Sequence, residues 1–223
     1  MPNPVSETLI LCGAQVVAWE RVSAPRADQL DYRAFGEIIA RVHTVPISEA
    51  PVPLSKCTDA GWLDLDERLE AASRSSVATG ADIAVLSSAI ENVAAWRSMA
   101  DRAAPVLCHG DAHPLNVLMR SDEVVVADWD SLCIGPPAWD HAPLLTWAER
   151  WGGHATAYRD FAAGYGQDLS DTTLAKTIAR VRLIGPTLTM IIRGDTSPQH
   201  AAEARRRMQY WHSQPDAPTW TPQ

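Results

Sequence analysis

Several features are scarce in this sequence, and each scarcity excludes a class of protein. Only two lysines occur among 19 basic residues, and 27 acidic residues give a formal net charge of −8. A nucleic-acid or anionic-membrane surface needs clustered basic side chains to neutralise phosphates, so neither partner is expected. The arginine cluster at residues 205–207 is interpreted as the solvated face of a late helix.

Cysteine and long apolar runs are scarce as well. The four cysteines, Cys12, Cys57, Cys108 and Cys133, are widely spaced and form no CxxC pair. This spacing predicts reduced thiols in a cytosolic protein and no disulfide framework. No stretch is long and apolar enough for a membrane helix, and the first residues lack the basic segment of a signal peptide. We therefore expect a cytoplasmic protein without a membrane partner.

What is present is enough apolar sequence for a substantial core. The chain has 223 residues, 46% of them hydrophobic, which fits one large domain or two unequal lobes. Residues 8–12 and 16–22 are rich in β-branched side chains and flank a Gly-Ala turn signal, so they predict two strands. Helical periodicity begins near Asp28, which can cap the helix, and ends before Pro46. Further helices are predicted at 63–72, 81–99, 138–151, 155–164, 170–193 and 198–211, and a disordered tail at 213–223.

Chemistry-bearing side chains gather in residues 107–118, LCHGDAHPLNVL, and in the ADWD that follows at 127–130. The apolar segments around them predict short strands at 105–108, 116–119 and 124–127. The polar residues are therefore expected on a loop and a hairpin between helices.

One interpretation of this cluster is a zinc site. His109, Asp111 and His113 alternate along the chain, which on a strand would place three ligands on one face. Pro114 follows at once and disfavours a continuing strand, and no further His-rich cluster could complete a second metal site. A zinc-dependent hydrolase is therefore the weaker alternative.

A second interpretation is phosphoryl transfer, which needs a carboxylate facing the attacking hydroxyl and oxygen ligands for Mg²⁺. Asp111 can supply the carboxylate, and Asn116 and Asp128 can supply the oxygen ligands. The first lies on the loop, the second at the start of a strand and the third at the end of the returning strand. All three would converge on one end of the hairpin. This spacing is more demanding than any single carboxylate, so we favour this interpretation.

The segments HGDAHPLNVL and VVVADWDSLCIGPPAWDHA resemble the catalytic core of the aminoglycoside phosphotransferase family, a branch of the protein-kinase-like fold that includes choline, homoserine and macrolide kinases. The likeness is specific over residues 106–142, and weaker likenesses in VVAWERV and FGEIIARVHTVP extend it over most of the chain. The resemblance implies an α/β (α+β) fold. Its parts would be a two-stranded N-lobe remnant with the hinge at 1–22, a mostly helical C-lobe at 23–212 with a catalytic loop at 107–130, and the tail at 213–223.

The resemblance also implies an activity and the residues that carry it. The chain would transfer the γ-phosphate of ATP to a hydroxyl of a small molecule, with Asp111 as the catalytic aspartate and Asn116 and Asp128 as the Mg²⁺ ligands. The acidic net charge is compatible with a cationic acceptor such as an aminosugar or a choline-like amine, but it does not identify one. The adenine would face the backbone at Ala18, Trp19 and Glu20.

Other residues of the motif would support the loop. By the resemblance, His109 braces it through packing and hydrogen bonding, and Asp140 holds its backbone from the start of the next helix. Asp130 either braces the loop or faces the acceptor. His113 is interpreted as a local scaffold or a substrate-edge group rather than a metal ligand.

The chain departs from the family's pattern at its front. The glycine-rich loop and the strand lysine that hold the nucleotide phosphates are missing, and Lys56 and Lys176 both follow the expected hinge. We expect either a truncated reading frame, which is favoured, or a non-catalytic kinase-like module that binds a ligand or partner. In either case ATP should bind weakly, and uncovered strand edges should promote self-association.

Overall fold

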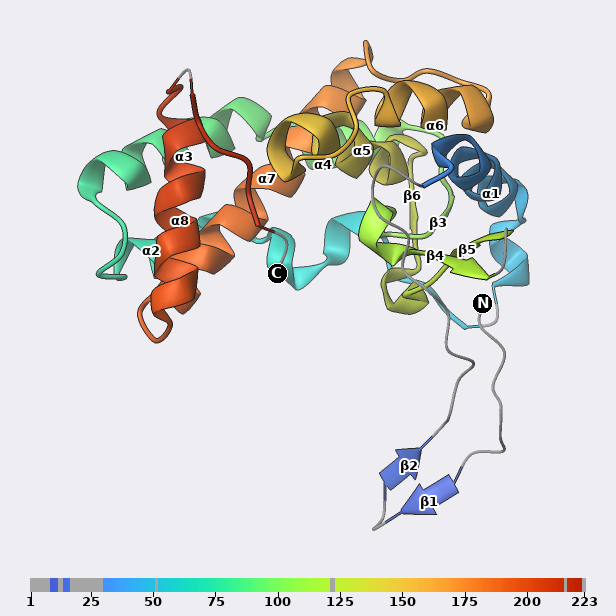
Figure 1. Ribbon diagram of the computed structural model, residues 1–223, viewed down its shortest axis with the longest axis horizontal. Helices are drawn as coiled ribbons and strands as arrows, with labels where there is room; N and C mark the ends of the chain where they lie inside the picture. The colour runs from blue at the N-terminus through green and yellow to red at the C-terminus, as the bar shows by residue number, and fades with distance from the viewer. Residues whose placement is uncertain are drawn as a thin grey trace.

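The computed structural model describes residues 9–11, 14–16, 30–50, 52–120, 123–214 and 216–221. Helices dominate this part of the chain, and short strands pair in two-stranded antiparallel ribbons (Figure 1). The strands are β1 (Leu9–Leu11), β2 (Ala14–Val16), β3 (Val106–Cys108), β4 (Val117–Arg120), β5 (Glu123–Val126) and β6 (Cys133–Gly135). The helices are α1 (Tyr32–Thr44), α2 (Leu65–Ser73), α3 (Gly80–Val93), α4 (Trp96–Arg102), α5 (Ala138–Trp151), α6 (Ala157–Tyr165), α7 (Thr173–Gly194) and α8 (Pro198–Trp211).

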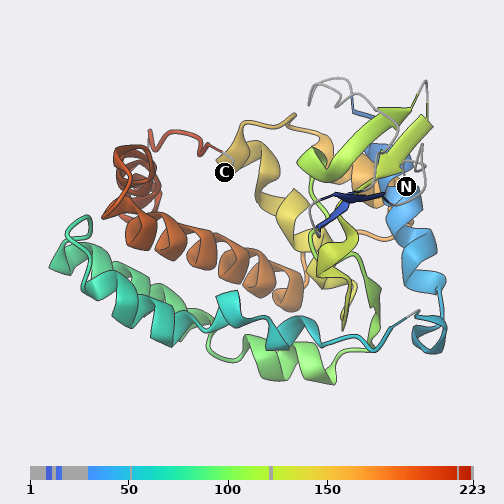
Figure 2. The ribbon, with the colours of Figure 1, turned by 90° about the horizontal axis from the view of Figure 1, so that it is seen from below.

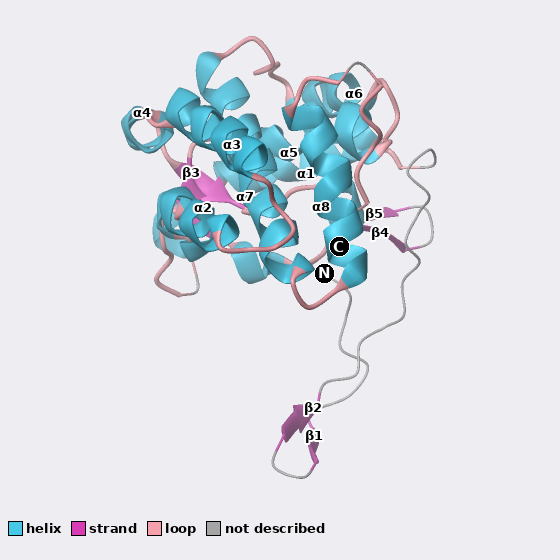
Figure 3. Cartoon of the chain, turned by 90° about the vertical axis from the view of Figure 1, so that its left-hand side faces the viewer, coloured by secondary structure: helices cyan, strands magenta, loops and turns pink. Residues whose placement is uncertain are grey.

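The expected N-terminal hairpin forms. β1 and β2 run antiparallel, with Leu9 opposite Val16 and Leu11 opposite Ala14. Figure 3 shows these two strands in magenta, apart from the helices. The second strand begins at Ala14, earlier than the sequence predicted, and the rest of the predicted strand, residues 17–22, lies outside the described residues.

α1 and α6 pack with their backbones in contact. Asp31 caps α1 by accepting a hydrogen bond at 2.9 Å from the backbone N–H three residues on. The sequence favoured Asp28 as the cap, and that residue lies outside the described ranges. A Cβ atom on Gly36 would lie 2.1 Å from the carbonyl oxygen of Phe161 on α6. The two helices can therefore approach this closely only with glycine at position 36.

α7 packs at the centre of a group of helices, where it contacts α2, α3, α4, α5 and α8 (Figure 2). Its buried residues include Ile184, Leu188 and Ile191, which belong to the main hydrophobic core. Pro186 lies inside α7, and Pro143 lies inside α5. Because proline has no N–H, each interrupts one backbone hydrogen bond of its helix.

Two ribbons hold the segment that carries the polar motif. β4 pairs with β5, with Val117 opposite Val126, as the sequence predicted. β3 pairs with β6, with Cys108 opposite Cys133. The sequence did not predict β6, because its three residues, the last of which is the glycine of the Gly-Pro-Pro break, are too few to show a periodic pattern.

The C-terminal segment corrects the prediction of a disordered tail. Within its described residues Trp220 is 3% exposed, and its backbone N–H donates to the carbonyl oxygen of Arg150 at 2.6 Å. Thr221 N donates to Glu203 Oε1 at 2.9 Å, and Arg207 Nη2 donates to Thr221 O at 3.0 Å. Arg207 is thus buried, contrary to the expected solvated arginine face, while its two arginine neighbours are exposed. Composition indicated the lack of secondary structure but could not show that one tryptophan anchors the segment.

The sequence predicted no membrane span and no disulfide, and the structure describes the helices and three of the four cysteines. Among the helices of the described ranges, none combines the length and the apolar character needed to cross a membrane. Cys57, Cys108 and Cys133 are all buried and carry free thiols.

Candidate active site

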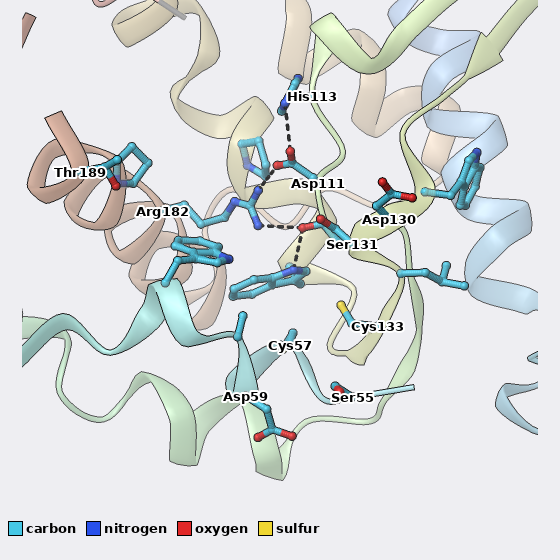
Figure 4. Close-up of a pocket in the computed structure, with 18 of the residues that line it drawn as sticks. Ser55, Cys57, Asp59, Asp111, His113, Asp130, Ser131, Cys133, Arg182 and Thr189 are labelled. Atoms are coloured by element: carbon cyan, nitrogen blue, oxygen red, sulfur yellow. Dashed lines mark hydrogen bonds and ion pairs between the residues drawn. The ribbon is translucent and has the colours of Figure 1, made fainter. Parts of the chain in front are cut away.

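A cavity of about 910 Å³ opens beside the polar motif. It is bounded by residues 52–57, by residues 129–133, and by faces of α5 and α7. Figure 4 shows Asp111 and His113 on one side of this space and Arg182 of α7 facing them. The cavity therefore brings the loop of the motif together with a helix that lies far along the chain.

Gly110 sets the shape of the loop. Its φ angle is +89°, and a Cβ atom at this position would lie 1.8 Å from the carbonyl oxygen of Ser131. Gly110 N donates to Asp140 Oδ1 at 2.9 Å, and Gly110 O accepts hydrogen bonds from Trp139 Nε1 and Arg182 Nη1, both at 3.0 Å. A side chain would exclude this conformation, so the HGD sequence requires glycine in the middle for a steric reason.

Asp140 holds the loop from the first turn of α5. Its side chain is fully buried, and its Oδ2 accepts hydrogen bonds from His109 N at 2.7 Å and His43 Nε2 at 3.0 Å. Burial raises the pKa of Asp140, but the hydrogen bond from His43 and the nearby histidine charges outweigh it and hold the pKa below its ordinary value. His109 in turn accepts from Asp111 N at 3.3 Å through Nδ1 and contacts Ala127 O at 2.9 Å through Nε2. Both ring nitrogens of His109 are therefore used in linking the loop to the end of β5.

The Asp111 carboxylate is held by two basic groups. Arg182 Nη2 lies 2.5 Å from Oδ1, and His113 Nε2 lies 3.2 Å from Oδ2. Burial raises the pKa of Asp111, but the hydrogen bond from His113 and the charge of Arg182 outweigh it and place the pKa well below its ordinary value. His113 itself stacks on Trp147 of α5, with ring centroids 5.6 Å apart. Asp111 is thus ionised and pre-positioned at neutral pH.

Asn116 and Asp128 lie at the same end of the β4–β5 hairpin. Asn116 O accepts a hydrogen bond from Ala127 N at 2.8 Å, and its side-chain Nδ2 donates to Asp111 O at 2.9 Å. Asp128 adopts a left-handed conformation with φ +61°, is exposed, and makes no side-chain hydrogen bond within the described residues. The Asn116 amide oxygen and the Asp128 carboxylate are both hard oxygen donors, so this pair fits Mg²⁺ better than a soft metal.

The zinc interpretation of residues 109–113 is not supported by the geometry. Both ring nitrogens of His109 are already engaged by the backbone. In the described part of the chain, the group close enough to share a metal ion is His43, Cys108 and Asp140. That group is buried and linked by its own hydrogen bonds, including His43 to Asp140 and the Cys108 thiol to a backbone carbonyl. Hydrogen bonding accounts for this cluster without a metal.

Arg182 is the residue of the site that the sequence analysis missed. It lies 71 positions from Asp111 in the chain, so the motif's spacing could not include it. Its guanidinium also lies over the rings of Trp139, at 5.0 Å, and Trp62, at 5.6 Å from the ring centroid. The available signal was an arginine inside the apolar run VRLIG of a predicted helix. A charge at such a position is rarely buried without a partner, so this pattern indicates an ion pair with a distant carboxylate.

The structure does not decide the roles of the remaining predicted site residues. Asp130 is exposed and lines the cavity, which is compatible with both roles considered for it. The residues expected to face the adenine, Ala18, Trp19 and Glu20, lie outside the described residues. Their assignment stays a prediction.

The comparisons with known proteins agree with the motif. The sequence model of the phosphotransferase enzyme family (APH) matches residues 6–184. Among curated proteins, none matches the sequence closely enough to count as a relative. A choline/ethanolamine kinase family protein from Mesorhizobium loti has a similar structure, with a TM-score of 0.69 and 17% identity over 95% of this chain and 73% of that one.

Two further solved structures are similar. Spectinomycin phosphotransferase APH(9)-Ia, in complex with ADP and spectinomycin, gives a TM-score of 0.63 with 17% identity over 94% of this chain and 70% of that one. The GDP complex of aminoglycoside 2'-phosphotransferase-IIIa gives a TM-score of 0.65 with 16% identity over 95% of this chain and 75% of that one. At such identities the likeness concerns the fold, and it confirms the predicted kinase-like, mostly helical architecture.

Proposed function

Because the chain belongs to the phosphotransferase enzyme family, we propose that it transfers the γ-phosphate of ATP to a hydroxyl group of a small molecule. In this proposal Asp111 faces the acceptor hydroxyl, and Asn116 and Asp128 hold Mg²⁺. The observation that carries the proposal is the position of the Asp111 carboxylate. It lines a cavity large enough for a small molecule and lies on a loop whose backbone is hydrogen-bonded to Asn116.

The residues have the chemistry that the reaction needs. The acceptor oxygen forms a bond to the γ-phosphorus while the bond from that phosphorus to the leaving oxygen of ADP breaks, and the hydroxyl proton passes to Asp111. The depressed pKa of Asp111 keeps it ionised, so its main task is to orient the hydroxyl, because positioning accounts for most of the catalysis in this reaction class. Mg²⁺, when bound, would neutralise charge on the phosphates.

A non-catalytic, kinase-like binding module is the second candidate. One observation favours it: the ion pair with Arg182 engages the carboxylate that would have to meet the acceptor. A chain that only binds a ligand could keep such a pair permanently, whereas a phosphotransferase has to release Asp111 when the acceptor arrives.

Asp111→Asn decides between these candidates. A phosphotransferase should lose ~10² to 10⁴-fold in the rate of phosphate transfer from γ-labelled ATP to a panel of small alcohols. The melting temperature should fall somewhat, because Arg182 loses its charged partner, and the assay is run well below the melting transition of the variant. The matched control is Asp171→Asn, which neutralises a fully exposed aspartate at the start of α7, away from the cavity. Transfer by the Asp111 variant at the parental rate would refute the assignment, and no transfer by the parent on any acceptor would favour the binding module.

The metal dependence gives a separate test. Oxygen donors at Asn116 and Asp128 should make transfer depend on Mg²⁺ or Mn²⁺, and Asp128→Ala should weaken binding of Mn²⁺ followed by its paramagnetic signal. Elemental analysis of protein purified without chelator should find less than one zinc per chain. A stoichiometric zinc that disappears in His113→Ala would restore the hydrolase alternative.

A further inference from the structure

We propose that the acceptor is a hydroxyl-bearing anion whose carboxylate or phosphate group binds Arg182. The inference rests on the proposed function and goes beyond it by giving the acceptor a chemical class. It also gives Arg182 a role: the acceptor's anionic group shares the guanidinium with Asp111, which loosens the ion pair and lets the carboxylate meet the hydroxyl.

The cavity differs in charge from the rest of the chain. The whole sequence is acidic, with a net charge of −8. The cavity, in contrast, is lined by four basic residues and three acidic ones. The basic residues are Lys56, Arg182, Arg193 and Arg207, and the acidic residues are Asp59, Asp111 and Asp130. Lys56 is paired with Asp101 at 3.1 Å and Arg207 with Glu203 at 2.9 Å, so Arg182 and Arg193 are the lining cations that can meet an anionic ligand.

Two of the three carboxylates already have partners. Asp111 is paired with Arg182, and Asp59 Oδ2 accepts a hydrogen bond from the backbone N–H of Lys56 at 3.3 Å. Asp59 keeps its charge, because its partner is a neutral N–H, so Asp59 and Asp130 are the carboxylates of the described lining that remain to face a positive ligand. A polycationic aminosugar would place several ammonium groups beside Arg182 and Arg193 with two carboxylates to meet them, and such like-charge contacts are unfavourable.

Two of the five tryptophans that line the cavity, Trp139 and Trp147, offer little open ring face to a quaternary ammonium group. Trp139 stacks on Trp96 at 6.0 Å, and Arg182 lies over the same indole at 5.0 Å. Trp147 stacks on His113 at 5.6 Å and on Trp151 at 5.9 Å. Cation–π binding needs an open aromatic face, and at Trp139 a cation of the chain already takes that position.

Arg182 and Arg207 are suited to receive an anion. The side chain of Arg182 is 10% exposed, and its two hydrogen bonds to the motif loop use fewer N–H groups than a guanidinium carries. Arg207, at another part of the lining, is 1% exposed and already paired with Glu203, while its Nη1 has no hydrogen-bond partner in the described structure. A buried guanidinium N–H without a partner is costly, and an anionic ligand would satisfy it.

The contact between Arg182 and Asp111 limits the acceptor further. Arg182 Nη2 is ion-paired with Asp111 Oδ1, so an anion bound to Arg182 lies close to a hydroxyl bound to Asp111. The two groups must therefore be separated by only a few bonds in the acceptor. Hydroxy acids and phosphorylated diols have this arrangement, and the partly exposed ring of Trp62 beside Arg182 suits an apolar or flat remainder.

Calorimetry without nucleotide tests the inference independently of catalysis. The probes are 3-phenyllactate for the carboxylate, glycerol 3-phosphate for the phosphate, and the neutral 3-phenylpropane-1,2-diol and glycerol as their isosteres. Choline and kanamycin serve as cationic probes. We expect at least one anion to bind about tenfold or more tightly than its neutral isostere, and the cations to bind more weakly than both.

Arg182→Gln should remove that tenfold preference, and Arg182→Lys, which keeps the charge but not the planar fork, should retain part of it. The matched control is Arg180→Gln on the same helix, because Arg180 is exposed and lies over Trp211 rather than in the cavity. Melting temperatures of all variants show whether a loss of binding reflects unfolding. If the Gln variant of a folded protein keeps the full preference, Arg182 is not the anion site.

The test separates this inference from the proposed function. Anion binding that depends on Arg182 but leads to no transfer of label from ATP supports the anion site and counts against phosphotransfer. Transfer to choline or kanamycin, with no preference for either anion, supports phosphotransfer and overturns the anionic acceptor. Equal binding of anions and their neutral isosteres also overturns it.

Discussion

Replacing Gly110 with alanine should destabilise the protein far more than the same change at Gly166. The two glycines share a φ angle of +89°. They differ in their surroundings: a Cβ at Gly110 would lie 1.8 Å from Ser131 O and 2.7 Å from Ser131 C, whereas a Cβ at Gly166 would have no neighbour within 4 Å. Gly166→Ala therefore measures the cost of the backbone conformation alone, and Gly110→Ala adds the cost of the collision.

The expected magnitudes follow from these two terms. A left-handed conformation costs an alanine roughly 1–2 kcal/mol, which is the whole effect expected at Gly166. At Gly110 the loop has to move away from Ser131, and forcing extra atoms into packed structure costs roughly 1–3 kcal/mol more. The movement also strains the bond from Gly110 N to the buried Asp140 carboxylate, since hydrogen bonds to charged groups contribute roughly 1.5–3 kcal/mol. The free energy of unfolding should thus fall by about 3–5 kcal/mol or more.

Urea titration followed by tryptophan fluorescence is a suitable assay, because one of the nine tryptophans, Trp139, donates directly to Gly110 O. With a urea m-value of ~2 kcal/mol per molar, the midpoint should drop by about 2 M for Gly110→Ala and by less than about 1 M for Gly166→Ala. Equal midpoints for the two variants would refute the argument that the HGD glycine is fixed by its contact with Ser131.

Three further outcomes follow from buried groups. The His141 imidazole is fully buried, and burial with the nearby His43 charge lowers its pKa to about 4, so the unfolded state binds a proton first as the pH falls. Stability should therefore drop by about 3 kcal/mol between pH 6.5 and 4, and His141→Gln should show a flatter curve in urea titrations across this range. Trp220→Ala should cost roughly 3–5 kcal/mol by the same titration, whereas a cost below about 1 would mean that the C-terminal segment is not anchored. Asp140→Asn should cost about 3 kcal/mol or more, because an amide cannot accept from every donor around that site, and a change below about 1 kcal/mol would count against its role as the loop's anchor.

The parts of the site that the sequence predicted are those set by short-range spacing. Asn116 and Asp128 flank two strands joined by a tight connection, so their meeting at one end of the hairpin follows from strand pairing alone. The fold class was also predicted, from the resemblance of the motif segments to the phosphotransferase family. Periodicity located most helices to within a few residues, but it merged α3 and α4 into one helix at 81–99, because the break between them carries no proline or glycine. The role of each residue stays a proposal, since arrangement does not measure activity.

The parts that could not be predicted depend on contacts between distant segments. β6 forms because β3 offers an unpaired edge. Arg182 reaches Asp111 because α7 forms the wall of the cavity opposite the motif loop. Trp220 is buried only because α5 and α8 leave space for it. Each case is decided by packing in three dimensions, about which local propensity carries little information.

The proline inside α7 has a consequence for how the helix moves. α7 has 22 residues and is about 33 Å long, but Pro186 leaves the carbonyl of Arg182 without its helical donor. In the following turn the hydroxyls of Thr187 and Thr189 donate back to the carbonyls four residues earlier, at 2.8 and 3.0 Å, which further favours bending. In amide hydrogen exchange α7 should therefore behave as two segments, with faster exchange where they join than in either half. The half that carries Arg182 is hydrogen-bonded to the motif loop, and the half after Pro186 carries the core residues Leu188 and Ile191, so the joint separates the part of α7 that serves the site from the part that serves the core.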